Sequence, residues 1–346
     1  MPIVPQSQPI VNNSVESFDS DDKIMKWTKK KAASRRMAAR LFKAGLETRA
    51  ARMYECGDYI MQRINPATGE IMTDTTQLCR DRLCPTCSWR LSLRRFSEMM
   101  AVFSALSDEI ASNGYKVSML TLTVRNMALN ELRPAIDAFS KAWHNMSRRD
   151  LFSDVIGWTR SLEITYNKKS DTYHPHYHCI LIWRNESFTE AAAEIMREAW
   201  KHAYKCDYNP IIDIRDVYCK DGLSPEKGSI IRAALEAFKY SVKEDSVKYI
   251  PDKDLFNFAA AIKNVRFVSY GKAIKEMRKA LGFKNDDLAQ PENITNNCPD
   301  SLIIAVMRWN GTAYTKTALE AEPWRLSRER LRREIELAAA DESEVQ

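Results

Sequence analysis

The chain has 346 residues, of which 45% are hydrophobic, so it is long and apolar enough to bury one large core or several smaller ones. This composition excludes an intrinsically disordered protein, and no run approaches the roughly 18 apolar residues that a membrane span needs. The formal net charge of +6 is unevenly distributed, with basic residues gathered in a few segments, which indicates a polyanionic partner. Because the N-terminus lacks the apolar core of a secretory signal, we expect a cytoplasmic protein, in which close-set cysteines are metal ligands before they are disulfides.

The N-terminal segment divides into a tail and a basic helix. Residues 1–22 are rich in Ser, Asn, Pro and Gln and have no periodic apolar face, which predicts a flexible tail. Residues 23–52 place Ala, Met and Leu between many Lys and Arg residues, a composition typical of a helix. These cations are either a solvated helix face or an arm that contacts phosphates. The candidate DNA contacts here are Lys29, Lys30, Arg35 and Arg36.

Four cysteines follow this helix. Cys84-Pro85-Thr86-Cys87 is a C-x2-C knuckle, in which one tight turn supplies two ligands to a tetrahedral structural zinc ion. Cys56 and Cys79 would complete the shell, although 22 residues separate them, and free buried cysteines are the alternative. The surrounding arginines continue into a helix and would present cations to the DNA backbone: Arg80, Arg82, Arg90, Arg94 and Arg95.

The central region, about residues 114–272, alternates strands and helices. In chain order we expect a strand at 116–124, a helix at 132–147, a strand at 158–166, a polar loop at 167–172, a strand at 176–183 and a helix at 189–204. The strands on either side of the polar loop form a hairpin, which brings Glu163 level with the histidines that follow it.

Three of the five histidines lie in the run His174-Pro175-His176-Tyr177-His178. Residues two apart in a strand point to the same side, so His176 and His178 can chelate one ion while Tyr177 turns into the core. Glu163 becomes the third ligand if the hairpin register sets it opposite His176 or His178. Two imidazoles and one carboxylate with open coordination positions suit Mg²⁺ or Mn²⁺ that also coordinates a phosphate oxygen. A structural zinc site, ordinary surface histidines and an oxygenase iron are the alternatives.

A helix pattern at residues 234–243 carries Glu236, Tyr240 and Lys243 at positions i, i+4 and i+7, which places all three on one stripe. A phenolate can attack phosphorus and form a covalent phosphotyrosine, so Tyr240 is a candidate nucleophile. Lys243 could lower the phenol pKa or stabilise the phosphate charge, and Glu236 could deprotonate water. The alternative is a tyrosine in the core beside a solvated Glu and Lys.

The order of these motifs resembles rolling-circle replication initiators of the small Gram-positive-type plasmid family. The matching segments are Thr121-Leu122-Thr123, then the histidine run, then Glu236-x3-Tyr240-x2-Lys243. The run C-x4-C-P-x-C-x-W-R, from Cys79 to Arg90, looks like the N-terminal element of that family, and Glu163 also fits. Together the matches cover roughly residues 55 to 275, and their joint specificity exceeds that of each short motif.

The resemblance implies an α+β protein with an HUH endonuclease core, a central antiparallel sheet flanked by helices, joined to a zinc-binding module. It implies that His176 and His178 bind the metal and that Tyr240 nicks the plasmid origin. The nick leaves Tyr240 on the 5′ phosphate and a free 3′-OH primer that a DNA polymerase extends. Glu236 then activates water at termination, after the displaced strand is cut and rejoined. The DNA partner is a single-stranded or hairpin nick site with its flanking duplex.

The remaining sequence sets the domain plan. No G-x4-G-K-[ST] phosphate loop is present, so a host helicase must unwind the plasmid. A loop at 291–299 precedes a basic helix at 324–340, which docks on DNA or on another subunit, or is simply solvated. The expected domains are a tail at 1–22, a basic helix and zinc module at 23–110, a nicking and joining domain at 111–290 and a helical C-terminal extension at 291–346.

Three other functions compete with this one. An HUH transposase or mobilisation relaxase would use similar chemistry on another DNA. A zinc-containing DNA-binding regulator would bind without forming a covalent adduct. An oxygenase could use the histidine and glutamate ligands, but the chain lacks the Gly-flanked histidine-carboxylate pattern of the common His-x-His oxygenases.

Overall fold

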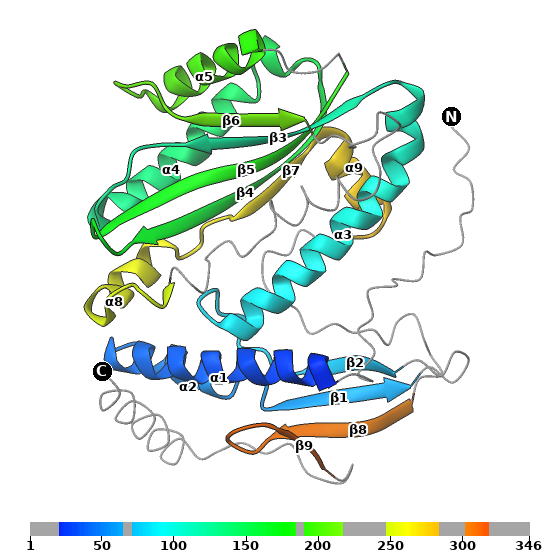
Figure 1. Ribbon diagram of the computed structural model, residues 1–346, viewed down its shortest axis with the longest axis vertical. Helices are drawn as coiled ribbons and strands as arrows, with labels where there is room; N and C mark the ends of the chain where they lie inside the picture. The colour runs from blue at the N-terminus through cyan, green and yellow to red at the C-terminus, as the bar shows by residue number, and fades with distance from the viewer. Residues whose placement is uncertain (1–20, 65–70, 185–189, 217–246, 284–301, 318–346) are drawn as a thin grey trace.

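The computed structural model describes residues 21–64, 71–184, 190–216, 247–283 and 302–317. Within these residues the strands form two antiparallel sheets, with helices packed on them (Figure 1). The expected α+β class is therefore confirmed. The helices are α1 (Asp21–Lys43), α2 (Glu47–Tyr54), α3 (Pro85–Ser112), α4 (Leu129–Met146), the 3-10 turn η1 (Asp150–Phe152), α5 (Glu190–Tyr204), α8 (Asp252–Ala261) and α9 (Lys272–Ala280).

The larger sheet has the strand order β6-β3-β5-β4-β7, and every neighbouring pair is antiparallel. Its strands are β3 (Lys116–Thr123), β4 (Val155–Asn167), β5 (Thr172–Trp183), β6 (Ile212–Asp216) and β7 (Val268–Gly271). The predicted hairpin is confirmed, because β4 pairs with β5 along its length and the turn lies between Asn167 and Thr172. β5 begins at Thr172, earlier than the predicted start at 176, so His174 pairs with Thr165 inside the strand.

Helices cover both faces of the larger sheet. On one face α4 and α5 pack through aromatic rings, and the Phe139 ring lies 5.0 Å from Tyr177 and 5.2 Å from Trp200. On the opposite face, α3 and α9 bury apolar side chains against Ile180 and Ile182 of β5. Because side chains alternate along a strand, the even-numbered His176 and His178 share the α3 face with these isoleucines, while Tyr177 enters the aromatic layer.

The smaller sheet has the order β2-β1-β8-β9 and joins strands from opposite ends of the sequence. Its strands are β1 (Tyr59–Ile64), β2 (Ile71–Thr76), β8 (Leu302–Trp309) and β9 (Tyr314–Thr317). α1 lies along this sheet in Figure 1. The two are held by a separate apolar cluster in which the Trp27 and Trp89 rings meet edge to face at 5.0 Å, beside Trp309 and Tyr314.

Two expectations about the terminal parts of the chain are met only in part by the described residues. The composition of 291–346 predicts a helical extension, but in its described part, residues 302–317, the chain forms β8 and β9, which complete the smaller sheet. The run Leu302–Trp309 is rich in apolar and β-branched residues, which favours a strand. The single helix expected at 23–52 is divided into α1 and α2. Gly45 has φ +79°, and Leu46 N–H donates to the Leu41 carbonyl at 2.9 Å, so a glycine C-cap ends α1.

The two sheets are connected by polar contacts between α1 and the segment that begins α8. Arg40 donates to Asp252 Oδ1 at 2.7 Å and to the Val247 carbonyl at 3.0 Å. The guanidinium also donates to the Ile250 carbonyl. Among the residues that the structure describes, no helix has the length and hydropathy required to span a bilayer.

Candidate functional site

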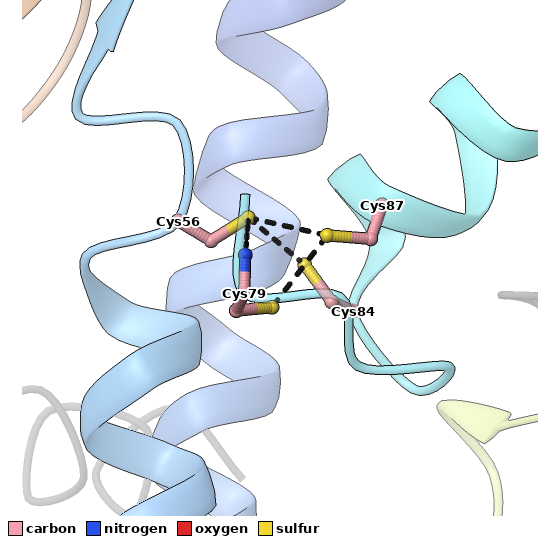
Figure 2. Close-up of side chains that lie close together, drawn as sticks. All are labelled: Cys56, Cys79, Cys84 and Cys87. Carbon is pink, nitrogen blue, oxygen red and sulfur yellow. Dashed lines mark hydrogen bonds between the residues drawn. The ribbon is translucent and has the colours of Figure 1, made fainter. Parts of the chain in front are cut away.

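Four cysteines converge at the junction of the two sheets, and we call them the four-cysteine cluster (Figure 2): Cys56, Cys79, Cys84 and Cys87. Cys56 Sγ lies 3.5 Å from Cys87 Sγ and 3.6 Å from Cys84 Sγ, and Cys79 Sγ lies 3.6 Å from Cys87 Sγ. Four sulfurs at about 2.3 Å from one ion in a tetrahedron are about 3.8 Å apart. All four side chains are buried, so donor type, spacing and burial fit a closed structural zinc site.

The thiols of the four-cysteine cluster differ in their tendency to ionise. Burial raises the pKa of Cys79, and a hydrogen bond with Cys56 raises the pKa of Cys87. Burial also opposes ionisation of Cys84, but hydrogen bonds from the three other cysteines and Ser34 outweigh it and hold its pKa well below the ordinary value. Because thiolates are the form that binds a metal, zinc binding at this cluster would be coupled to the release of protons.

A buried lysine holds the Cys56 loop. Lys31 is fully buried, and its ammonium donates to the carbonyls of Tyr54 at 2.6 Å and Cys56 at 2.9 Å and pairs with Asp58 at 2.5 Å. The basic run of 23–52 predicts a cationic surface for Lys31, yet Trp27, Lys31 and Ser34 recur at i, i+4 and i+7 on the buried face of α1. That recurrence beside a tryptophan is the sequence signal that could have identified it.

The other cysteine loop is fixed by arginines of α2. Arg49 makes a bidentate pair with Asp81 at 2.7 and 2.8 Å, and Asp81 Oδ1 also accepts the Leu83 N–H at 2.9 Å. Arg52 donates to the Cys79 carbonyl at 2.7 Å. These contacts set the backbone on which the sulfurs of Cys79 and Cys84 are presented.

Replacing Cys87 with alanine is expected to remove bound zinc and to lower the Tm. Loss of a structural metal belongs to the substitutions that cost about 4 kcal/mol or more, which corresponds to a fall in Tm on the order of 10 °C for a chain of this size. Zinc content by atomic absorption and Tm by circular dichroism measure the two effects. Cys179→Ala is the matched control, because this cysteine is equally buried but lies in β5. Full zinc content and an unchanged Tm in Cys87→Ala would contradict the assignment of Cys87 as a ligand of a structural zinc ion.

A second group of ligands, which we call the Glu-His-His cluster, lies on the larger sheet: Glu163, His176 and His178. Its ligand atoms all lie within 4.8 Å of one another. Glu163 pairs directly with His176 across the β4-β5 hairpin, as the predicted register requires. Glu163 Oε2 lies 2.9 Å from His178 Nε2 and 3.2 Å from His176 Nε2. The three side chains therefore point at one position on the α3 face of the sheet.

The outer ring nitrogens of both histidines have partners. His176 Nδ1 donates to the His174 carbonyl at 3.3 Å, and His178 Nδ1 lies 3.3 Å from the hydroxyl of Thr121, its register partner on β3. These contacts orient both Nε2 atoms toward the Glu163 carboxylate. Two imidazoles and one carboxylate fit a divalent cation with open coordination positions.

The Glu-His-His cluster is the part of the predicted catalytic site that lies within the described residues. Glu236, Tyr240 and Lys243 lie outside the described residues. Tyr177, although between the two histidines, is 1% exposed on the opposite face, and burial raises its pKa to about 12. It is therefore unsuitable as a nucleophile at this site.

The basic residues of α1 and α3 are only partly available to DNA. Lys29 and Arg36 are exposed on α1, and Lys30 is half-buried. Arg35 pairs with Asp58 at 3.4 Å, Arg90 lies over the Trp27 ring at 5.3 Å, and Arg94 pairs with Glu98 at 2.8 Å. Arg95 is 6% exposed, so its expected role as a backbone contact is corrected: it faces the interior from α3.

Arg80 and Arg82 lie on the cysteine loop. Arg80 is exposed, and the Arg82 guanidinium lies over the Phe267 ring at 4.5 Å. Both therefore occupy the surface between the four-cysteine cluster and the segment that leads into β7.

Comparisons with known proteins give one matching family model and several similar proteins. Residues 71–315 match the family model described as replication protein. A protein named Protein rep from Bacillus amyloliquefaciens is 31% identical over 76% of this chain and 82% of its own length. Another Protein rep, from Streptococcus pneumoniae, is 28% identical over 86% of this chain and 96% of its own length. No solved structure shows significant similarity to the chain.

Proposed function

Because the chain belongs to the replication protein family, we propose that it initiates rolling-circle replication of a plasmid by nicking one strand of the origin. The observation that carries the nicking activity is the Glu-His-His cluster, whose ligand atoms lie within 4.8 Å of one another on paired strands. The five-stranded antiparallel sheet with helices on both faces supports the assignment of an HUH endonuclease core. The names of the relatives favour replication over a transposase or relaxase.

The proposed reaction is a transesterification in which Tyr240 is the nucleophile. Its phenolate oxygen bonds to phosphorus while the bond from phosphorus to the 3′ oxygen breaks, and that oxygen takes up a proton. The products are a 5′-phosphotyrosine and a 3′-OH primer. Mg²⁺ or Mn²⁺ held by Glu163, His176 and His178 would polarise the phosphate. Lys243 stabilises the phenolate, and Glu236 activates the water that releases Tyr240 at termination.

In this scheme the four-cysteine cluster stabilises the fold and takes no part in the reaction. We assign residues 23–110, together with strands β8 and β9, to a zinc module, and residues 111–290 to the nicking and joining domain. The tail at 1–22 and the basic helix expected at 324–340 lie outside the described residues. Because the sequence has no phosphate loop, the proposed partners include a host helicase as well as a DNA polymerase.

A nicking assay with two labels tests this proposal and its metal requirement. A single-stranded oligonucleotide that spans the origin of the parent plasmid is incubated with the protein in metal-depleted buffer, with and without added Mn²⁺. With Mn²⁺, the 3′-labelled strand is expected in a slow band that resists SDS, and the 5′-labelled strand in a short fragment that a polymerase extends. Without Mn²⁺, both products are expected to fall at least about 100-fold, because several kcal/mol of transition-state stabilisation is lost. Binding without either product would favour a zinc-containing DNA-binding regulator.

A further inference from the structure

A cavity of about 770 Å³ lies between the four-cysteine cluster and the segment that joins α8 to β7, and we call it the basic cavity. Its lining includes six cationic residues: Arg49, Arg52, Arg80, Arg82, Lys263 and Arg266. Asp81 is the one acidic residue among the described residues of the lining, and its carboxylate is already paired with Arg49. The cavity therefore carries a strong positive charge, which is suited to an anionic ligand with several negative groups.

The cations face one another from two walls that are far apart in the sequence. Arg80 and Arg82 lie on the cysteine loop, which is held by Arg49, Arg52 and the cluster itself. Lys263 and Arg266 are exposed on the opposite wall. The Arg82 guanidinium lies over the Phe267 ring at 4.5 Å, so the cysteine loop contacts the segment that continues from Arg266.

An exposed aromatic ring also lines the basic cavity. Phe256, on α8, is 52% exposed and lines the cavity with the six cations. Cationic grooves that carry accessible aromatic rings are typical of single-stranded nucleic acid sites, in which phosphates contact the cations and an unpaired base stacks on the ring. Bases of a duplex are stacked on each other and do not present their faces in this way.

The wall of the basic cavity that carries Arg266 leads into the sheet that holds the Glu-His-His cluster. The wall that carries Arg266 continues into Phe267, whose carbonyl accepts the Leu162 N–H at 2.7 Å, next to Glu163 on β4. The following residue, Val268, pairs with Ser161, which in turn pairs with His178. Two strand pairings and one short segment therefore link this wall of the cavity to the strands that carry the Glu-His-His cluster.

We propose that the basic cavity binds single-stranded DNA next to the nicked phosphate. In this complex Arg80 and Arg266 contact phosphates of the strand, and the Phe256 ring stacks on a base. This assignment rests on the proposed function for its choice of DNA as the polymer. It adds Phe256, Lys263 and Arg266 to the DNA contacts, none of which belongs to the motifs that indicate nicking.

The test measures binding of a fluorescein-labelled 20-nucleotide oligothymidylate by anisotropy at several NaCl concentrations, with no divalent cation added so that no cleavage occurs. Each phosphate contact contributes about 0.7 to the slope of log affinity against log salt for single strands. The double variant Arg80→Gln/Arg266→Gln is therefore expected to reduce this slope by about 1.4. Lys116→Gln/Lys141→Gln is the charge-matched control at exposed sites outside the cavity, and it is expected to keep the wild-type slope.

A second pair of variants tests the stacking contact. Phe256→Ala is expected to weaken binding of the oligothymidylate on the order of tenfold, and Phe256→Trp is expected to restore it. All altered side chains are exposed, so unchanged zinc content and Tm are the folding checks. A duplex of the same length is expected to bind without sensitivity to Phe256.

The outcomes separate this inference from the proposed function. A double variant with the wild-type salt slope, or Phe256→Ala with wild-type affinity, would overturn the basic cavity as a single-strand site even if the SDS-resistant band forms. Loss of affinity in these variants, in a protein that forms no such band with Mn²⁺, would support the cavity and refute nicking.

Discussion

Replacement of Tyr240 with phenylalanine is expected to abolish the SDS-resistant protein–DNA band and to leave DNA binding within about twofold of the wild type. The change removes only the hydroxyl whose oxygen bonds to phosphorus, so no covalent intermediate can form at this position. Adduct formation is measured with the 3′-labelled origin strand in Mn²⁺, and binding is measured by anisotropy without Mn²⁺. The expected loss of adduct is complete within detection.

The matched control is Tyr249→Phe, which makes the same chemical change in a tyrosine that is 48% exposed. This variant is expected to form adduct at the wild-type rate, because no step of the proposed reaction uses its hydroxyl. Adduct formation by Tyr240→Phe at an undiminished rate would mean that another residue attacks the phosphate.

Glu163→Gln and His178→Ala are each expected to reduce the single-turnover nicking rate on the order of 1000-fold. Glu163 Oε2 lies 2.9 Å from His178 Nε2, so the two substitutions act at one shared position: Glu163→Gln removes the negative charge, and His178→Ala removes a ligand atom. The bound cation stabilises the negative charge that develops on the phosphate in the transition state, and its loss raises the barrier by several kcal/mol. Mn²⁺ binding, followed by the water-proton relaxation rate, is expected to weaken in parallel.

His174→Ala provides the control within the same histidine run. Its ring lies 5.3 Å from that of His176, but its nitrogens are not part of the Glu-His-His cluster. We expect this variant to retain Mn²⁺ binding and to nick within about tenfold of the wild-type rate. If all three variants lost activity equally while Mn²⁺ binding stayed intact, the histidines would not act through a shared cation.

The proposed metal ligands could be predicted from the sequence because the interactions that place them are local. A hairpin with a short turn leaves few registers, and the alternation of side chains then puts Glu163 opposite His176. The same reasoning predicted that Tyr177 enters the core. Both strands of this hairpin are longer than predicted: β4 begins at Val155, and β5 begins at Thr172 and so includes His174.

The smaller sheet could not be predicted in the same way. β1 pairs with β8, so Tyr59 lies opposite Arg308 although the two residues come from opposite ends of the chain. No local pattern specifies such a partner. The 22 residues that separate Cys56 from Cys79 contain the β1-β2 hairpin, which returns the chain so that Gly57 N–H donates to the Gln77 carbonyl at 2.6 Å. A sequence spacing that looks long for a zinc site is therefore short in space.

The charge of a residue was a poor predictor of whether its side chain is exposed and able to contact DNA. Lys31 and Arg95 belong to basic segments that suggest a DNA-contacting surface, yet Lys31 is fully buried beside the Cys56 loop and Arg95 is 6% exposed. Lys263 and Arg266 belong to no recognised motif. They line the same cavity as Arg80 only because the end of α8 packs beside the cysteine loop. Burial and non-local packing decide which cations reach a ligand, and neither can be derived from a run of basic residues.

The most direct test of the covalent mechanism is to identify the residue that carries DNA after nicking. The SDS-resistant species formed with Mn²⁺ is digested with a nuclease and a protease, and the nucleotide-bearing peptide is sequenced by tandem mass spectrometry. The nucleotide is expected on Tyr240 through its 5′ phosphate. A nucleotide on any other residue, or nicked DNA with no modified peptide, would contradict the account.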